Sequence, residues 1–294
     1  MELIGHKSQK EFLKRLAENK RIPHAFLFVG ENSLGKKKAA FEFIKFLGGD
    51  EDDIIMLQPQ KKEIQINQVR DLQKSLRLRP RLSNLKSVII DNAQSLNDGA
   101  QNCLLKTLEE PRGNVFFFLI SSCPEMLLPT IRSRCAILKF YPLSFEQMKE
   151  CFKESKNPNF EEILLLSDGR PGRVLEFLEN PQSFSSFSGI FKEIEKLLQS
   201  NTGERFVFVK DFFEDKKNFR DSNLFLESLQ RYLRFFLLKK MAVNIKFCPD
   251  FSFNQKQSLA RIKQMIDSVE RIRLLIAKTN INQKLALESL MLMI

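Results

Sequence analysis

Residues 25–37 read AFLFVGENSLGKK, an apolar run of five residues followed by a loop of the pattern G-x-x-x-x-G-K. The apolar run has the length of a buried strand, and residues 36–47 have the periodicity of an amphipathic helix. A loop in this position directs its backbone N–H groups at an anion, and the helix N-terminus adds partial positive charge. Gly30, Gly35 and Lys36 therefore predict a phosphate-binding loop in an α/β fold.

Further apolar runs follow along the first 140 residues. Residues 87–91, 115–120 and 136–140 are mostly apolar rather than alternating, which is typical of parallel strands covered by helices on both faces. Helical patterns precede and separate them at residues 7–19 and 98–110, and the second is expected to end at Pro111. These elements predict an α/β domain over residues 1–142.

The chain after Pro142 reads as helices. Short helical patterns at residues 144–155, 159–166 and 173–178 predict a small helical domain over residues 143–182, which the resemblance given below implies is a lid domain. The polar, serine-rich residues 180–188 read as a linker. Apolar stripes along the rest of the chain predict an all-α third domain over residues 190–294.

Composition limits the class of protein. The net charge of +11 favours polyanionic partners without naming one, and a merely basic, solvated surface explains it equally well. Five scattered cysteines without a C-x-x-C pair, and only two histidines, argue against zinc and against a disulfide framework. No secretory signal or membrane-spanning run is recognised, so we expect a cytoplasmic protein.

Two positions depart from a working ATP site. The residue after Lys36 is normally Ser or Thr, because its hydroxyl holds Mg²⁺, but here it is Lys37, which cannot ligate a cation. Asp91 ends an apolar run and suits Mg²⁺, but Asn92 stands where a Glu would polarise the attacking water. The sequence predicts no hydrolysis and no productive Mg²⁺. It leaves open whether the loop binds ATP or ADP weakly, and favours a strand-helix turn without a ligand.

Arg134 is the second candidate for chemistry. It lies in a Ser-Arg-Cys step directly before the apolar run at residues 136–140. A guanidinium is permanently charged and forks onto phosphate oxygens, which suits it to act on ATP in an adjacent subunit. The alternative is that Arg134 caps a helix or pairs with a carboxylate, and a single isolated arginine favours that alternative.

Several motifs occur in a telling order: IPHAFLFVG at 22–30, DNA at 91–93, LLKTLEEP at 104–111, LPTIRSRC at 128–135, GRPGR at 169–173 and NINQKLALE at 280–288. Together they resemble the signatures of bacterial clamp-loader subunits, which are AAA+ proteins, and of the delta-prime type of DNA polymerase III in particular. Each motif is weak alone, but the ordered set is specific and spans nearly the whole chain.

The resemblance implies roles for particular residues. Arg134 would reach into the ATP site of a neighbouring subunit. Ser121 or Ser122 occupies the sensor-1 position and Arg173 the sensor-2 position, although the serines read equally as strand caps and Arg173 as a surface arginine. Lys106 would lie near the DNA backbone, although a solvated helix lysine is the plainer interpretation.

The resemblance also implies an assembly. The third domain would be a collar that joins this chain to ATPase subunits of the gamma/tau type and to a delta-type subunit, in a complex that places a sliding clamp on primed DNA. Residues 47–68 contain no cysteine, so the zinc module that relatives often carry there is absent. Two alternatives stay open: a working ATPase of the gamma/tau type that tolerates Lys37, and a stand-alone basic DNA-binding protein.

Overall fold

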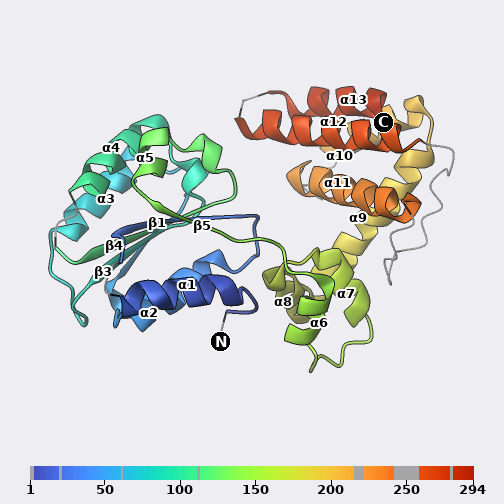
Figure 1. Cartoon of the computed structure of the whole chain (residues 1–294). Helices are drawn as coiled ribbons and strands as arrows, with labels where there is room; N and C mark the ends of the chain where they lie inside the picture. Colours follow the sequence, from blue (N-terminus) through green and yellow to red (C-terminus); the bar gives the residue numbers. More distant parts are fainter. Residues whose placement is uncertain are drawn as a thin grey trace. The chain divides into compact units, whose positions relative to one another are not determined.

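The computed structural model describes residues 3–19, 22–60, 62–110, 113–214, 222–241, 258–278 and 281–294 (Figure 1). Pro111, Cys248 and Asn280 lie outside the described residues. The chain forms two compact units, Met1–Leu175 and Glu176–Ile294. The boundaries of the predicted three domains stay a prediction.

The first unit contains a five-stranded parallel sheet. Its strands are β1 (Ala25–Val29), β2 (Ile54–Leu57), β3 (Lys86–Ile90), β4 (Val115–Ser121) and β5 (Ala136–Lys139), in the spatial order β2-β3-β4-β1-β5. The predicted α/β class is confirmed, and so are the four apolar runs as strands. Strand β2 was not predicted.

Helices cover both faces of this sheet (Figure 1). Helices α1 (Lys7–Glu18) and α2 (Lys36–Phe46) pack on one face, and α3 (Ile66–Leu76), α4 (Asp98–Glu109) and α5 (Pro129–Ser133) pack on the other. Phenylalanine fills the first interface: Phe26 stacks on Phe118 with ring centroids 5.4 Å apart, and Phe43 meets both rings edge-on. Such contacts explain part of the high phenylalanine content.

Three further helices follow the sheet, α6 (Phe145–Cys151), α7 (Phe160–Ser167) and α8 (Pro171–Glu179). The segment predicted as a linker is instead the start of α9 (Pro181–Gln199), so that prediction was wrong. The Asn180 side chain accepts hydrogen bonds from the backbone N–H groups of Gln182 and Ser183, and Pro181 occupies the first helical position. Both features favour the start of a helix.

The second unit is helical throughout its described residues. It contains α9, α10 (Thr202–Glu214), α11 (Ser222–Lys240), α12 (Leu259–Lys278) and α13 (Gln283–Met293). The stripe predicted on α11 is buried. On α12 the predicted stripe is buried at Ile262, Ile266, Val269 and Ile272, but Leu259 at its start is exposed and Ile276 at its end is only partly buried. No helix in the described part of the chain is long and apolar enough to span a membrane.

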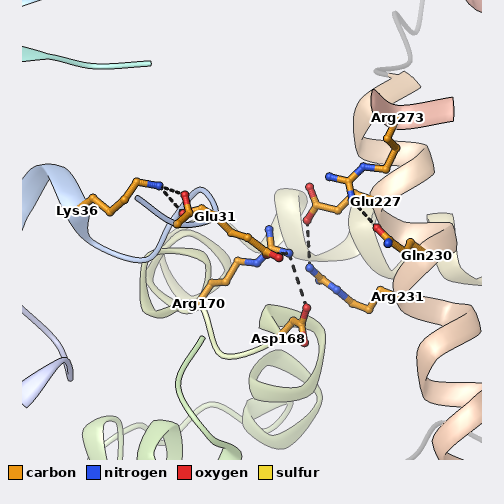
Figure 2. A network of polar contacts seen from close by, with 9 residues as sticks. Glu31, Lys36, Asp168, Arg170, Glu227, Gln230, Arg231 and Arg273 are labelled. Carbon is orange, nitrogen blue, oxygen red and sulfur yellow. Dashed lines mark hydrogen bonds and ion pairs between the residues drawn. The ribbon is translucent and has the colours of Figure 1, made fainter. Parts of the chain in front are cut away.

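A buried polar cluster lies between helices of the second unit (Figure 2). Arg231 forms an ion pair of 3.1 Å with Glu227 one turn earlier, and its guanidinium lies 5.5 Å from the centre of the Phe187 ring. Arg273 of α12 donates to the side chain of Gln230. Because buried charges require fixed partners, this cluster sets the register of α11 against its neighbours.

Candidate nucleotide site and interface arginine

The phosphate loop lies at the carboxyl end of β1, as predicted, and leads into α2. The N–H of Gly30 donates to the carbonyl of Ser121 at the end of β4, 3.1 Å away. Gly30 has φ of 152°, and a Cβ placed there would overlap the carbonyl oxygen of Phe140. Gly35, with φ of 86°, caps the N-terminus of α2. The sheet therefore fixes the start of the loop, and α2 begins at its end.

Replacing Gly30 with alanine is expected to lower the free energy of unfolding by about 1–3 kcal/mol, because the backbone conformation is strained for any L side chain and the nearest atom is backbone. Urea denaturation of both proteins measures this. Gly48 is the control, since its φ of 82° is also positive but nothing lies within 4 Å of its Cβ position. A Gly30→Ala variant no less stable than Gly48→Ala contradicts the close approach.

Lys36 is bonded inside the loop. Its side chain is buried, and its Nζ donates to the carbonyl of Gly30 and, over 2.6 Å, to that of Glu31 (Figure 2). Burial lowers the pKa of Lys36 to about 8, although the carboxylates of Asp91 and Glu31 favour the charged form. Any phosphate reaching this ammonium would compete with two carbonyl oxygens.

Lys37 and Asp91 form an ion pair. The Lys37 Nζ lies 3.5 Å from Oδ2 of Asp91, with both side chains partly exposed. The structure thus brings together the residue that replaces the Mg²⁺-binding hydroxyl and the carboxylate suited to Mg²⁺. The lysine ammonium lies where the carboxylate would need a metal ion.

Asn92 and Ser122 belong to one hydrogen-bonded group. Gln94 donates from Nε2 to Oδ1 of Asn92 and to Oγ of Ser122, each over 3.2 Å. Ser121 is buried, and its Oγ accepts the N–H of Cys123 over 3.1 Å, which is the predicted strand-capping role. Sequence reasoning missed Gln94. No group of three or more metal-binding side chains gathers within the described ranges of the chain.

Residues after α7 contact the loop directly. Arg170, only 4% exposed, forms an ion pair of 2.6 Å with Glu31 and a longer one of 3.7 Å with Asp168 (Figure 2). The N–H of Gly172 donates to the carbonyl of Ser33 over 2.9 Å. Arg173, the predicted sensor-2 residue, is also buried, so the surface-arginine alternative was wrong. Sequence reasoning missed Arg170 and Glu31.

A cavity of about 1330 Å³ opens over this region. Its lining includes the loop, Asp91, Asn92, Ser122 and Gly172, and also lysines of α1 and α2, namely Lys10, Lys14, Lys38 and Lys45. The predicted loop, strand-end and sensor-1 positions therefore share one basic cavity, while Ser121 lies buried beneath it.

Arg134 lies at the amino ends of the strands, opposite the end that carries the phosphate loop. It precedes the amino end of β5, which runs parallel to β1, whereas the phosphate loop follows the carboxyl end of β1. A strand of four to five residues separates the two by about 15 Å. Arg134 donates from Nη2 to Glu109 over 2.6 Å and from Nη1 to the carbonyl of Thr130 over 3.0 Å. The predicted pairing with a carboxylate is present. Arg134 is too far from the phosphate loop of its own chain to contact a phosphate bound there.

Lys106 is exposed in the last turn of α4. A cation there is favoured by the helix dipole alone. Its predicted contact with DNA stays a prediction.

Comparisons with known proteins agree with this fold. Residues 46–144 match the family model described as DNA polymerase III, delta subunit. The chain is 28% identical over 224 residues to the DNA polymerase III subunit delta' of Bacillus subtilis, covering 68% of each protein. It is 31% identical over 191 residues to that of Pseudomonas aeruginosa, covering 55% of this chain and 58% of the relative.

A solved structure extends the likeness in fold. The DNA polymerase III gamma subunit-related protein of Thermotoga maritima matches with a TM-score of 0.55 and 22% identity over 97% of both chains. The parallel sheet with its phosphate loop is an AAA+ fold, and the sequence matches make the chain similar to subunits of DNA polymerase III. The resemblance to the delta-prime subunits is confirmed by the curated relatives.

Proposed function

We propose that this chain is a delta-prime-type clamp-loader subunit, which assembles with ATPase and delta-type subunits to place a sliding clamp on primed DNA. It does not hydrolyse ATP, and it supplies Arg134 to the ATP site of a neighbour. We propose that it acts in the cytoplasm. The ion pair between Lys37 and Asp91 carries the proposal, since it separates this chain from an ATPase of the same fold.

The ion pair opposes metal binding in two ways. Mg²⁺ requires oxygen ligands in a tight octahedron, and Lys37 removes the hydroxyl that would be one of them. The lysine also places a positive charge 3.5 Å from the remaining carboxylate, where it repels a second cation. Without the metal, the charge that develops on the phosphates during transfer is not neutralised.

The position of the general base is also occupied by an amide. Asn92 has no basic oxygen, and its side-chain carbonyl accepts a hydrogen bond from Gln94. It therefore cannot accept a proton from water. Both defects argue against the working-ATPase alternative.

The topology supports the role in trans. Arg134 is 35% exposed at the edge of the sheet remote from its own loop, so it can reach a phosphate only in another subunit. The rate of nucleoside triphosphate hydrolysis in P-loop proteins increases strongly when such an arginine is supplied.

The isolated chain is expected to release no phosphate from Mg-ATP above the rate of a buffer blank. The measurement is a phosphate-release assay on the purified protein. A Lys36→Ala variant purified in the same way is the control, because a residual rate shared by both preparations belongs to a contaminant. Turnover of about one per second or faster by the unaltered chain, abolished in Lys36→Ala, would remove the proposal.

A further inference from the structure

The phosphate loop is joined to the segment before α8 by a buried ion pair. Arg170 is almost completely buried, and its Nη2 lies 2.6 Å from Oε2 of Glu31 in the loop (Figure 2). A buried guanidinium requires a compensating anion, and removal of that anion is costly. Glu31 lies nearer to this guanidinium than Asp168, which is 3.7 Å away.

A second contact joins the same two segments. The N–H of Gly172, in the first turn of α8, donates to the carbonyl of Ser33 over 2.9 Å. A Cβ at Gly172 would lie 2.9 Å from that same oxygen, so the backbones meet without room for a side chain. The amino end of α8 is thus directed at an oxygen of the loop.

Lys36 and Arg170, the two cations that contact the loop, are both bonded to oxygens of the protein. Lys36 donates to the carbonyls of Gly30 and Glu31, and Arg170 pairs with the Glu31 carboxylate. Lys36 and Arg170 repel each other, which is one of the influences that lower the pKa of Lys36. A phosphate group in this loop would normally relieve such repulsion. Here Glu31 supplies the negative charge.

We propose that Glu31 is a built-in substitute for a nucleotide phosphate, which joins the loop to the α8 segment and thereby excludes nucleotides from the site. Removal of its charge makes Arg170 available to an incoming phosphate, which then competes only with backbone carbonyls for Lys36. The site then binds a nucleoside triphosphate without Mg²⁺, because Lys37 already occupies Asp91. This inference rests on the proposed loss of metal binding but not on the role of Arg134.

The test is the substitution Glu31→Gln in the full-length chain. The Glu31 side chain is about half exposed, so the variant is expected to fold, and a thermal melt checks this. We expect N-methylanthraniloyl-ATP to bind Glu31→Gln at least tenfold more tightly than the unaltered chain. The affinity is expected to be the same within twofold in Mg²⁺ and in EDTA.

Two further variants serve as controls for Glu31→Gln. Glu51→Gln removes an exposed carboxylate that lines the basic cavity over the loop and is expected to leave binding unchanged. Arg170→Ala breaks the same ion pair but also removes a cation, so it is expected not to gain affinity. Hydrogen exchange at residues 168–175 is expected to accelerate in Glu31→Gln and to slow again when ATP is added.

Three outcomes overturn the inference. They are equal binding by Glu31→Gln and the unaltered chain, an equal gain from Glu51→Gln, and a gain that disappears in EDTA. None of these is decided by phosphate release from the isolated chain or by substitution of Arg134, so failure here leaves the proposed subunit role to its own tests.

Discussion

Replacing Arg134 with alanine is expected to slow hydrolysis about a thousandfold at the ATP site that receives this arginine in the assembled loader. A guanidinium stabilises the charge that spreads over the transferred phosphoryl oxygens. We expect the site of action to be another subunit, because Arg134 and its own phosphate loop lie at opposite ends of neighbouring strands. Single-turnover hydrolysis by the purified complex, with and without the substitution, measures the effect.

The same substitution is expected to leave folding and assembly intact. The Arg134–Glu109 ion pair is partly exposed on both sides, and such pairs contribute about 0–1 kcal/mol to stability. Size-exclusion chromatography of the complex checks assembly. Arg134→Lys is expected to recover little, since a lysine keeps the charge but loses the planar fork. Arg15→Ala removes an equally charged but strongly exposed arginine and is expected to change nothing. A fully assembled Arg134→Ala complex with unchanged single-turnover rates would remove the assignment.

The central strands could be predicted because burial on both faces makes them apolar throughout. Strand β2 and helix α3 escaped prediction for opposite reasons. Strand β2 is a four-residue edge strand in which three positions are only half buried. Helix α3 is largely polar, and only Val69 and Leu72 on it are buried. Strand β2 is apolar throughout but too short to be recognised, whereas α3 is long enough but has too few apolar residues to show a clear period.

Residues 180–188 were predicted to be a linker because of their composition, but they form the start of α9. The serines suggested a solvated segment, but Phe187 and Phe191 are buried one turn apart on one face of α9. The spacing of apolar residues, combined with the Asn180 cap, outweighs the serine content. The periodicity was the stronger signal.

The candidate site was only partly accessible from the sequence. The loop, Lys37 and Asp91 follow from residue types at fixed positions in a motif. The Glu31–Arg170 ion pair does not, because the two residues are 139 positions apart and the loop pattern places no demand on the residue at Glu31. Only the packing of the α8 segment against the loop brings them together.

Asp53 is expected to be among the most sensitive positions for stability. Its buried carboxylate accepts backbone N–H groups of Arg81, Leu82 and Ser83, and also the Ser83 hydroxyl, and so fixes the turn before β3. Asn at this position keeps the size but loses the charge and directs an NH₂ group at these donors. We expect Asp53→Asn to lower the free energy of unfolding by about 3 kcal/mol at pH 7, measured by urea denaturation.

The pH dependence distinguishes this mechanism from a simple packing defect. Burial alone would raise the pKa of Asp53, but the four hydrogen bonds outweigh it and hold the pKa well below its usual range. A carboxyl with a depressed pKa contributes stability above its unfolded value, near pH 4, and loses it as the pH falls toward the folded value. The difference in free energy of unfolding between the unaltered chain and Asp53→Asn is therefore expected to shrink by about 1.4 kcal/mol per pH unit below about pH 4. Asp52→Asn, at the exposed neighbouring position, is expected to show no such difference. If the difference in free energy of unfolding stays constant between pH 5 and pH 2.5, the charge of Asp53 contributes nothing to stability. A contribution from the ionised carboxylate would be lost on protonation.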